Sequence, residues 1–131
     1  MKFSQWLLHE EKSDKNFDGL FTDMFAARDH AHALHLATKS YAQHKALGNF
    51  YEGLLDLVDQ IIEAYQGKYG LISVEKIDHD KFSPEPVKFV SDFGDLVKKA
   101  RDMFEDEHLK NLIDEISALT YQTLYKLKFL K

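Results

Sequence analysis

With 131 residues, the chain has the length of one domain and leaves no room for a second domain of ordinary size. It carries 22 acidic residues against 17 basic ones, and the resulting net charge of −5 disfavours nucleic-acid binding of the strongly basic kind. There is no cysteine, which excludes disulfides, thiolate metal sites and thiol catalysis.

The N-terminal segment Met1–Leu8 is predicted to add a short docking helix. It is too short, and too soon followed by acidic residues, to serve as a signal peptide. No apolar run in the sequence approaches the roughly twenty residues that a membrane-spanning helix needs. We therefore expect a cytoplasmic protein without a membrane partner.

Two amphipathic helices are predicted next, over about 17–39 and 41–66, because apolar residues recur there at helical spacing. Ser40 is the expected N-cap of the second helix, since its hydroxyl can accept a hydrogen bond from an unpaired backbone amide. Gly67 is the expected C-terminal stop. The turn between the two helices is tight, so the helices must be antiparallel.

Residues 67–83 are predicted to form a long connector. Fully extended, they reach about 55 Å, whereas a helix of the length predicted for 41–66 spans only about 39 Å. The connector can therefore cross the whole length of a bundle. A long crossover between the second and third of four helices is typical of the ferritin-like class of four-helix bundle, which is the all-α fold class that we predict.

The last two helices are predicted over 84–104 and 106–130. Ser83–Pro86 has the residues of a helix start, with a capping serine and a proline in the first turn. A single helix over both ranges would be about 70 Å long, out of scale for this domain. We therefore place a break at Glu105–Asp106, with Asp106 as the cap of the last helix.

Histidine and acidic residues form a stripe that could carry chemistry. Four of the seven histidines fall between His30 and His44. His35 and His44 lie at similar distances on either side of Ser40, so they can face one another. Further residues follow His44 along one face of the second helix at spacings of three or four: Gly48, Glu52, Leu55, Asp59 and Glu63.

Imidazole and carboxylate ligands on facing helices, without cysteine, suit iron, with manganese or zinc as alternatives. Carboxylate-rich sites in helical bundles hold two irons and run oxygen or peroxide chemistry. The four-glutamate ferritin pattern needs a Glu-x-x-His motif on each of two helices. Its single match, Glu105–His108, lies at the predicted helix break, so that form of the site is not expected.

The segment Leu34–Ser40, followed by His44, Phe50–Tyr51, Asp59 and Glu63, resembles the mini-ferritins that protect DNA in starvation, the Dps family. In that family an aspartate and a glutamate follow the second-helix histidine by fifteen and nineteen positions, as Asp59 and Glu63 follow His44 here. The resemblance implies a homo-oligomer, at least a dimer. It also implies a ferroxidase centre that joins the histidines of one subunit to the carboxylates of its mate.

The matching part covers about residues 31–70, roughly a third of the chain. Together, the strings His35–Leu47 and Tyr65–Gly70 look closer still to an uncharacterised phage-encoded branch related to mini-ferritins. The resemblance implies that His35, His44, Asp59 and Glu63 are metal ligands. Glu52 joins them as a fifth candidate and His32 as a secondary one.

The sequence also departs from the family pattern. The two histidines are nine positions apart rather than twelve, and Leu36 stands where tryptophan is usual. Gly48 stands where the family carries a further acidic ligand, a loss for which Glu52, one turn later, could compensate. The basic N-terminal tail with which the family binds DNA is absent, so direct nucleic-acid binding is not expected.

Two functions therefore remain open. The first is iron binding and oxidation of iron(II) by dioxygen or peroxide at a site between subunits. The second is a non-enzymatic helical bundle that keeps the fold, has lost the site and binds a protein partner. Under the second, the acidic stripe is a solvated helix face, and His32 and His35 are structural. Gly48 and Leu36 favour this alternative.

Overall fold

Four α-helices make up most of residues 15–131, the part of the chain that the computed structural model describes. They are α2 (Lys15–Ala37), α3 (Tyr41–Tyr69), α4 (Pro86–Arg101) and α5 (Glu107–Phe129). No strand occurs within this range, so the predicted all-α class is confirmed. The predicted docking helix Met1–Leu8 lies outside the described residues. Among the described helices, none is long and apolar enough to cross a membrane.

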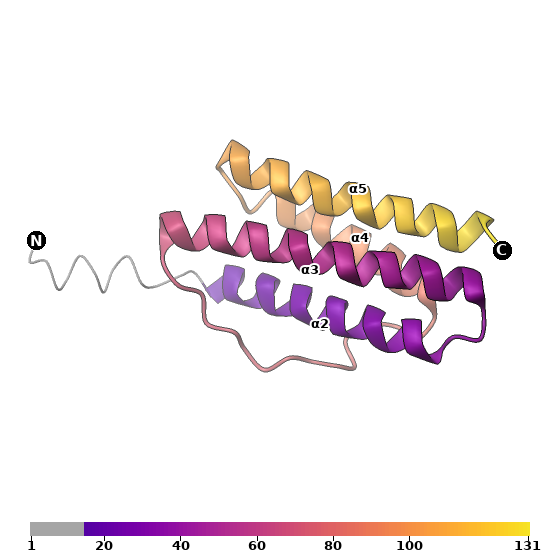
Figure 1. Ribbon diagram of the computed structural model, residues 1–131. Helices are drawn as coiled ribbons and strands as arrows, with labels where there is room; N and C mark the ends of the chain where they lie inside the picture. The colour runs from indigo at the N-terminus through magenta and orange to yellow at the C-terminus, as the bar shows by residue number, and fades with distance from the viewer. Residues whose placement is uncertain (1–14) are drawn as a thin grey trace, which may run out of the picture.

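The helices pack as two antiparallel pairs (Figure 1). α3 contacts both α2 and α5, and α5 also contacts α4, whereas α2 and α4 touch at few points. α3 and α4 run in one direction, and α2 and α5 run in the other. The end of α2, the start of α3 and the end of α5 therefore lie at the same end of the bundle.

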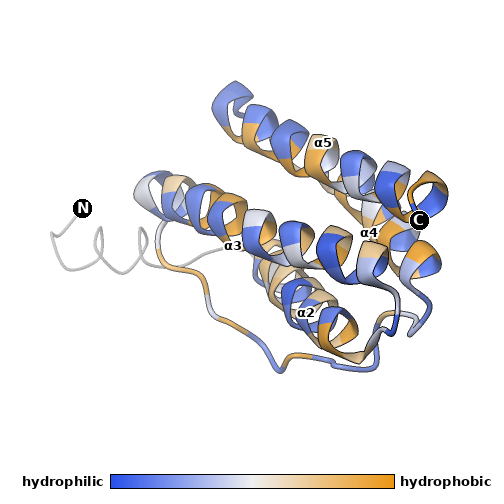
Figure 2. Ribbon diagram, turned by 45° about the vertical axis from the view of Figure 1, so that its right-hand side comes forward, coloured by the Kyte–Doolittle hydropathy of each residue, from blue (hydrophilic) through white to orange (hydrophobic). Residues whose placement is uncertain are grey.

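Each helix turns apolar residues toward the interior and polar residues outward, as Figure 2 shows by hydropathy. Burying an aromatic or aliphatic side chain of this size stabilises the fold by about 1.5–3 kcal/mol. The largest side chains with almost no exposed surface come from all four helices: Phe21, Met24, Leu47, Phe50, Leu54, Ile61, Phe89, Phe93, Leu109, Ile113 and Ile116.

The ends of α3 follow local chemistry. The hydroxyl of Ser40 accepts a hydrogen bond from the Gln43 amide at 3.2 Å, so Ser40 is the N-cap that its sequence position suggests. The helix does not stop at Gly67, where we predicted its end, but continues to Tyr69. Gly70 is the C-cap, with a φ of 101° that favours glycine.

The segment between α3 and α4 lies along α2 and is held there by polar contacts (Figure 1). The contacts advance along α2 as the segment advances, so the segment passes from one end of the bundle toward the other. They are the Ser73 amide to Asp18 at 3.1 Å, the Glu75 amide to Thr22 at 2.9 Å, Lys81 to Asp23 at 3.3 Å and His30 to the Ser83 carbonyl at 2.6 Å.

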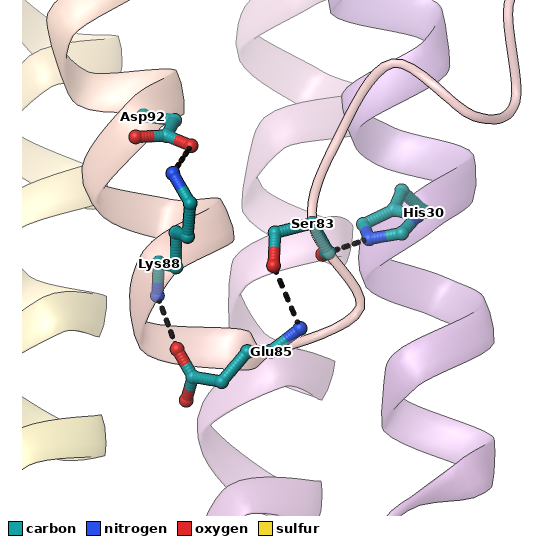
Figure 3. A network of polar contacts seen from close by, with 5 residues as sticks. All are labelled: His30, Ser83, Glu85, Lys88 and Asp92. Carbon is teal, nitrogen blue, oxygen red and sulfur yellow. Dashed lines mark hydrogen bonds and ion pairs between the residues drawn. The ribbon is translucent and has the colours of Figure 1, made fainter.

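The start of α4 is drawn in Figure 3. α4 begins at Pro86, the second proline of the predicted start signal, and Glu85 rather than Ser83 is its N-cap. The Glu85 carboxylate accepts the Lys88 amide at 2.6 Å, while the Ser83 hydroxyl accepts the Glu85 amide at 3.1 Å. One turn on, the Lys88 ammonium lies 2.8 Å from Asp92. Ser83 therefore holds Glu85, the N-cap residue of α4, in position.

Asp106 precedes α5 and joins its start to the end of α3. Its carboxylate makes no cap hydrogen bond with α5, because it accepts hydrogen bonds from the Lys68 ammonium and the Tyr69 hydroxyl. These hydrogen bonds lower the pKa of Asp106 below its usual 3.8. They also explain why α3 extends to Tyr69: its last residues have partners across the bundle.

This contact predicts a pH-dependent stability. Since the folded-state pKa of Asp106 is depressed, ionised Asp106 stabilises the fold above about pH 4, and this contribution is lost as the pH falls through the lowered pKa. We expect Asp106→Asn to lower the thermal unfolding midpoint at neutral pH, with a difference that shrinks in acid. Asp95→Asn, at an exposed site, is the control. A difference that persists unchanged at low pH would contradict the assignment.

Candidate functional site

A pair of stacked imidazoles closes the turn between α2 and α3. The ring centroids of His35 and His44 are 3.7 Å apart, and the ring planes are inclined by only 17°. His35 Nδ1 donates to the carbonyl of His44 at 2.6 Å, and His44 Nδ1 donates to the carbonyl of His35 at 2.8 Å. A carbonyl oxygen can only accept, so both Nδ1 atoms carry a proton, and in the neutral form of each ring Nε2 is the nitrogen with the lone pair.

Gly48 makes room for this pair. A Cβ atom at position 48 would lie 2.9 Å from Cε1 and 3.0 Å from Nδ1 of His35, closer than packed atoms allow. Glycine costs a helix interior about 1 kcal/mol relative to alanine, and here the contact with the His35 ring accounts for it. Gly53 has a different neighbour, since its Cβ would meet Leu119 of α5 at 3.0 Å.

Three more rings extend the imidazole pair into a row along α2 and α3. His32 stacks on Tyr51 with centroids 4.2 Å apart, and Tyr51 meets His35 edge-on at 5.3 Å. At the other end, the Tyr41 ring centroid is 6.4 Å from that of His44. Sequence reasoning did not identify Tyr51 as a member, although its position seven residues after His44 places both on one helix face.

The predicted carboxylates do not join the imidazoles within one chain. Glu52, Asp59 and Glu63 are exposed on α3, and Asp59 follows His44 by fifteen residues, about 22 Å along the helix. Among residues 15–131, no three histidine or acidic side chains lie close enough together to hold a metal ion. Within residues 15–131 of one copy, the predicted imidazole and carboxylate ligands therefore do not form one site.

A basic and apolar surface, which we call the basic pole, lies at the same end of the bundle. Residues 30–51 and 116–131 contain no acidic residue, although the whole chain has 22, and the fold brings the two runs together (Figure 1). None of its five lysines forms an ion pair with another described residue. They are Lys39, Lys45, Lys126, Lys128 and Lys131.

Large apolar side chains are exposed among these lysines. Tyr41 is 76% exposed, and Leu36 and Phe129 are each 69% exposed. Leu130 is about half exposed and lines the same pocket as Tyr41. The charge summed over the whole chain does not reveal the basic pole, because the signal is the position of the two acid-free runs in the sequence.

The fold and the site together define a four-helix protein with an imidazole pair and a basic pole at one end. Residues 35–127 match the model of a family of unknown function (DUF5856), and the chain belongs to that family. The chain is similar to a protein of Enterobacteria phage T4 described as an uncharacterized 14.6 kDa protein in the mobD-ri intergenic region. The two are 28% identical over 130 residues, which cover 97% of this chain and 98% of the relative.

These comparisons support one part of the predicted resemblance and leave the other part untested. The T4 relative is consistent with the predicted phage-encoded branch. Neither the family match nor the T4 relative points to mini-ferritins, so that part stays a prediction. No solved structure matches the chain.

Proposed function

We propose that the protein is a non-enzymatic module with a ferritin-like four-helix fold, and that it acts by binding another protein. The observation that carries this proposal is the basic pole, where lysines without an ion pair among residues 15–131 lie near exposed apolar side chains. Scattered exposed apolar residues are normal, but a group of them rimmed by polar residues marks an interaction site. Tyr41 and Leu130 form such a group, because both line one pocket together with Lys45, Lys126 and Lys131.

The ferritin-like part of the proposal is supported by topology. The chain forms two helical hairpins, α2–α3 and α4–α5, and the segment between them lies along α2. α3 and α4 consequently run in the same direction, as a long crossover requires.

The geometry of the histidine pair supports a structural role. Each ring bonds the backbone of the opposite helix, so the pair fastens α2 to α3 at the turn. The ring of His35 occupies the space beside position 48, where the mini-ferritin pattern would place an acidic ligand.

A second candidate function is metal binding, and a specific observation favours it. Protein histidines that bind metals commonly donate their other ring N–H to a carbonyl, which fixes the tautomer and frees the ligating nitrogen. His35 and His44 both have this arrangement at Nδ1. A homodimer could add Glu52, Asp59 and Glu63 of the second copy, and iron(II) oxidation would be the reaction, with manganese or zinc as alternative metals.

An aerobic iron(II) titration separates the two functions. For the non-enzymatic module we expect iron oxidation at the rate of buffer alone, unchanged in His44→Ala. Accelerated oxidation that is lost in both His44→Ala and Glu63→Gln would instead establish the metal site. The solution mass, measured in parallel by light scattering, shows whether the dimer that this site needs is present.

Site-specific photo-crosslinking tests the binding function itself. A benzophenone amino acid replaces Tyr41 in one variant and Glu63, outside the basic pole, in the other. We expect crosslinks to a distinct partner in bacterial extract from position 41 only, and mass spectrometry identifies the partner. Equal crosslinking from both positions, or none from position 41, would refute the module.

A further inference from the structure

We infer that the groove between the start of α3 and the end of α5 binds an acidic amphipathic helix of a partner protein. This inference rests on the proposed function and names the binding surface and the kind of partner. The groove has a volume of about 430 Å³ and opens within the basic pole.

The lining of the groove combines small and large apolar residues with polar residues and lysines. Ala42 and Ala46, one turn apart on α3, are small, and Leu130 of α5 and Tyr41 add larger apolar surface. Small residues let a neighbouring helix approach closely, and larger side chains of that helix can fill the space above them. A groove between two helices suits the apolar face of a third helix.

The charge of the groove selects the partner. Lys45, Lys126 and Lys131 line it, and no acidic residue does. None of these lysines has an ion-pair partner within residues 15–131. Carboxylates that flank the apolar face of a bound helix would pair with these ammonium groups and fix its register. The expected partner is thus an acidic helix with one apolar face.

A protein helix suits this surface better than a nucleic acid does. Single-stranded nucleic acid needs aromatic platforms for successive bases, whereas Tyr41 is the single aromatic residue that lines the groove. An apolar centre with a charged rim is the usual anatomy of a protein interface.

The test uses the full chain and a synthetic helical peptide with leucines on one face and glutamates on its flanks. A second peptide has the same composition in an order that scatters the leucines. We expect fluorescence anisotropy to show binding of the first peptide only, weakened at high salt. The double variant Lys126→Glu/Lys131→Glu should weaken binding at least about tenfold. Lys98→Glu/Lys99→Glu, with the same charge change on α4, should not.

Filling the groove provides a test that leaves the charge unchanged. Ala42→Trp should weaken peptide binding by a similar factor, and circular dichroism checks that the variant keeps its helices. The inference is wrong if the amphipathic peptide does not bind, or if both peptides bind equally. It is also wrong if both double variants weaken binding equally, or if an oligothymidylate or anionic vesicles bind in place of the peptide.

The outcomes also separate the inference from the function on which it rests. Crosslinks from position 41 without peptide binding would overturn the inference about the groove but would still support the interaction module. If neither crosslinks nor peptide binding were observed, the inference and the proposed function would both be wrong.

Discussion

Gly48→Ala should lower the free energy of unfolding by about 1 kcal/mol, although alanine favours helix by about 1 kcal/mol. The added Cβ would lie 2.9 Å from Cε1 of His35, so the ring must move. Its movement breaks the hydrogen bond that the His35 ring donates to the His44 carbonyl, worth about 1 kcal/mol, and the ring stacking, worth about 0.5–1.5 kcal/mol.

Chemical denaturation measures this effect, and Gly67→Ala is the matched control in the same helix. Nothing lies within 4 Å of a Cβ at position 67, so that variant should gain stability, by up to about 1 kcal/mol. In a His35→Ala background, Gly48→Ala should become neutral or stabilising. If it remains equally destabilising there, the ring of His35 is not the cause.

The four helices were predictable because each has a long amphipathic pattern with few interruptions. The ends of these helices were less predictable. α3 passes through Gly67, a residue that often follows a helix, because the helix gains contacts further on. Tyr69, its last residue, donates a hydrogen bond to Asp106, which precedes α5. A partner so distant in sequence cannot be read from the local pattern.

The candidate site was likewise predictable only in part from the sequence. Equal distance from a tight turn brings His35 and His44 together, and this geometry needs only the helix repeat. The helix repeat also placed Asp59 and Glu63 on one stripe with His44, but a stripe extends along the helix. Its members share a face without meeting, because Asp59 lies about 22 Å from His44 along the helix.

The remaining features depend on contacts that only the fold defines. The two Nδ1 hydrogen bonds depend on rotamers, and the role of Gly48 depends on where the His35 ring lies. The basic pole depends on runs that are far apart in the sequence, 30–51 and 116–131, which meet only because α2, α3 and α5 share one end of the bundle.

Phe89→Ala should have the largest effect on stability, a loss of about 4 kcal/mol. Phe89 is fully buried at the sparse contact between α2 and α4. Its ring lies 4.6 Å from His30 of α2, 5.2 Å from Phe82 of the connecting segment and 6.1 Å from Phe50 of α3, measured between centroids. Truncation removes aromatic contacts with three parts of the chain at once and leaves a cavity.

Such a loss is a large part of the 5–15 kcal/mol that typically stabilises a domain, so Phe89→Ala should unfold well below the wild-type temperature. Phe129→Ala removes the same side chain from a site that is 69% exposed, and its stability should change by no more than about 0.5 kcal/mol. Because Phe129 belongs to the basic pole, its loss should instead reduce crosslinking from position 41. If both variants lose stability equally, Phe129 is part of the core and cannot belong to a binding surface.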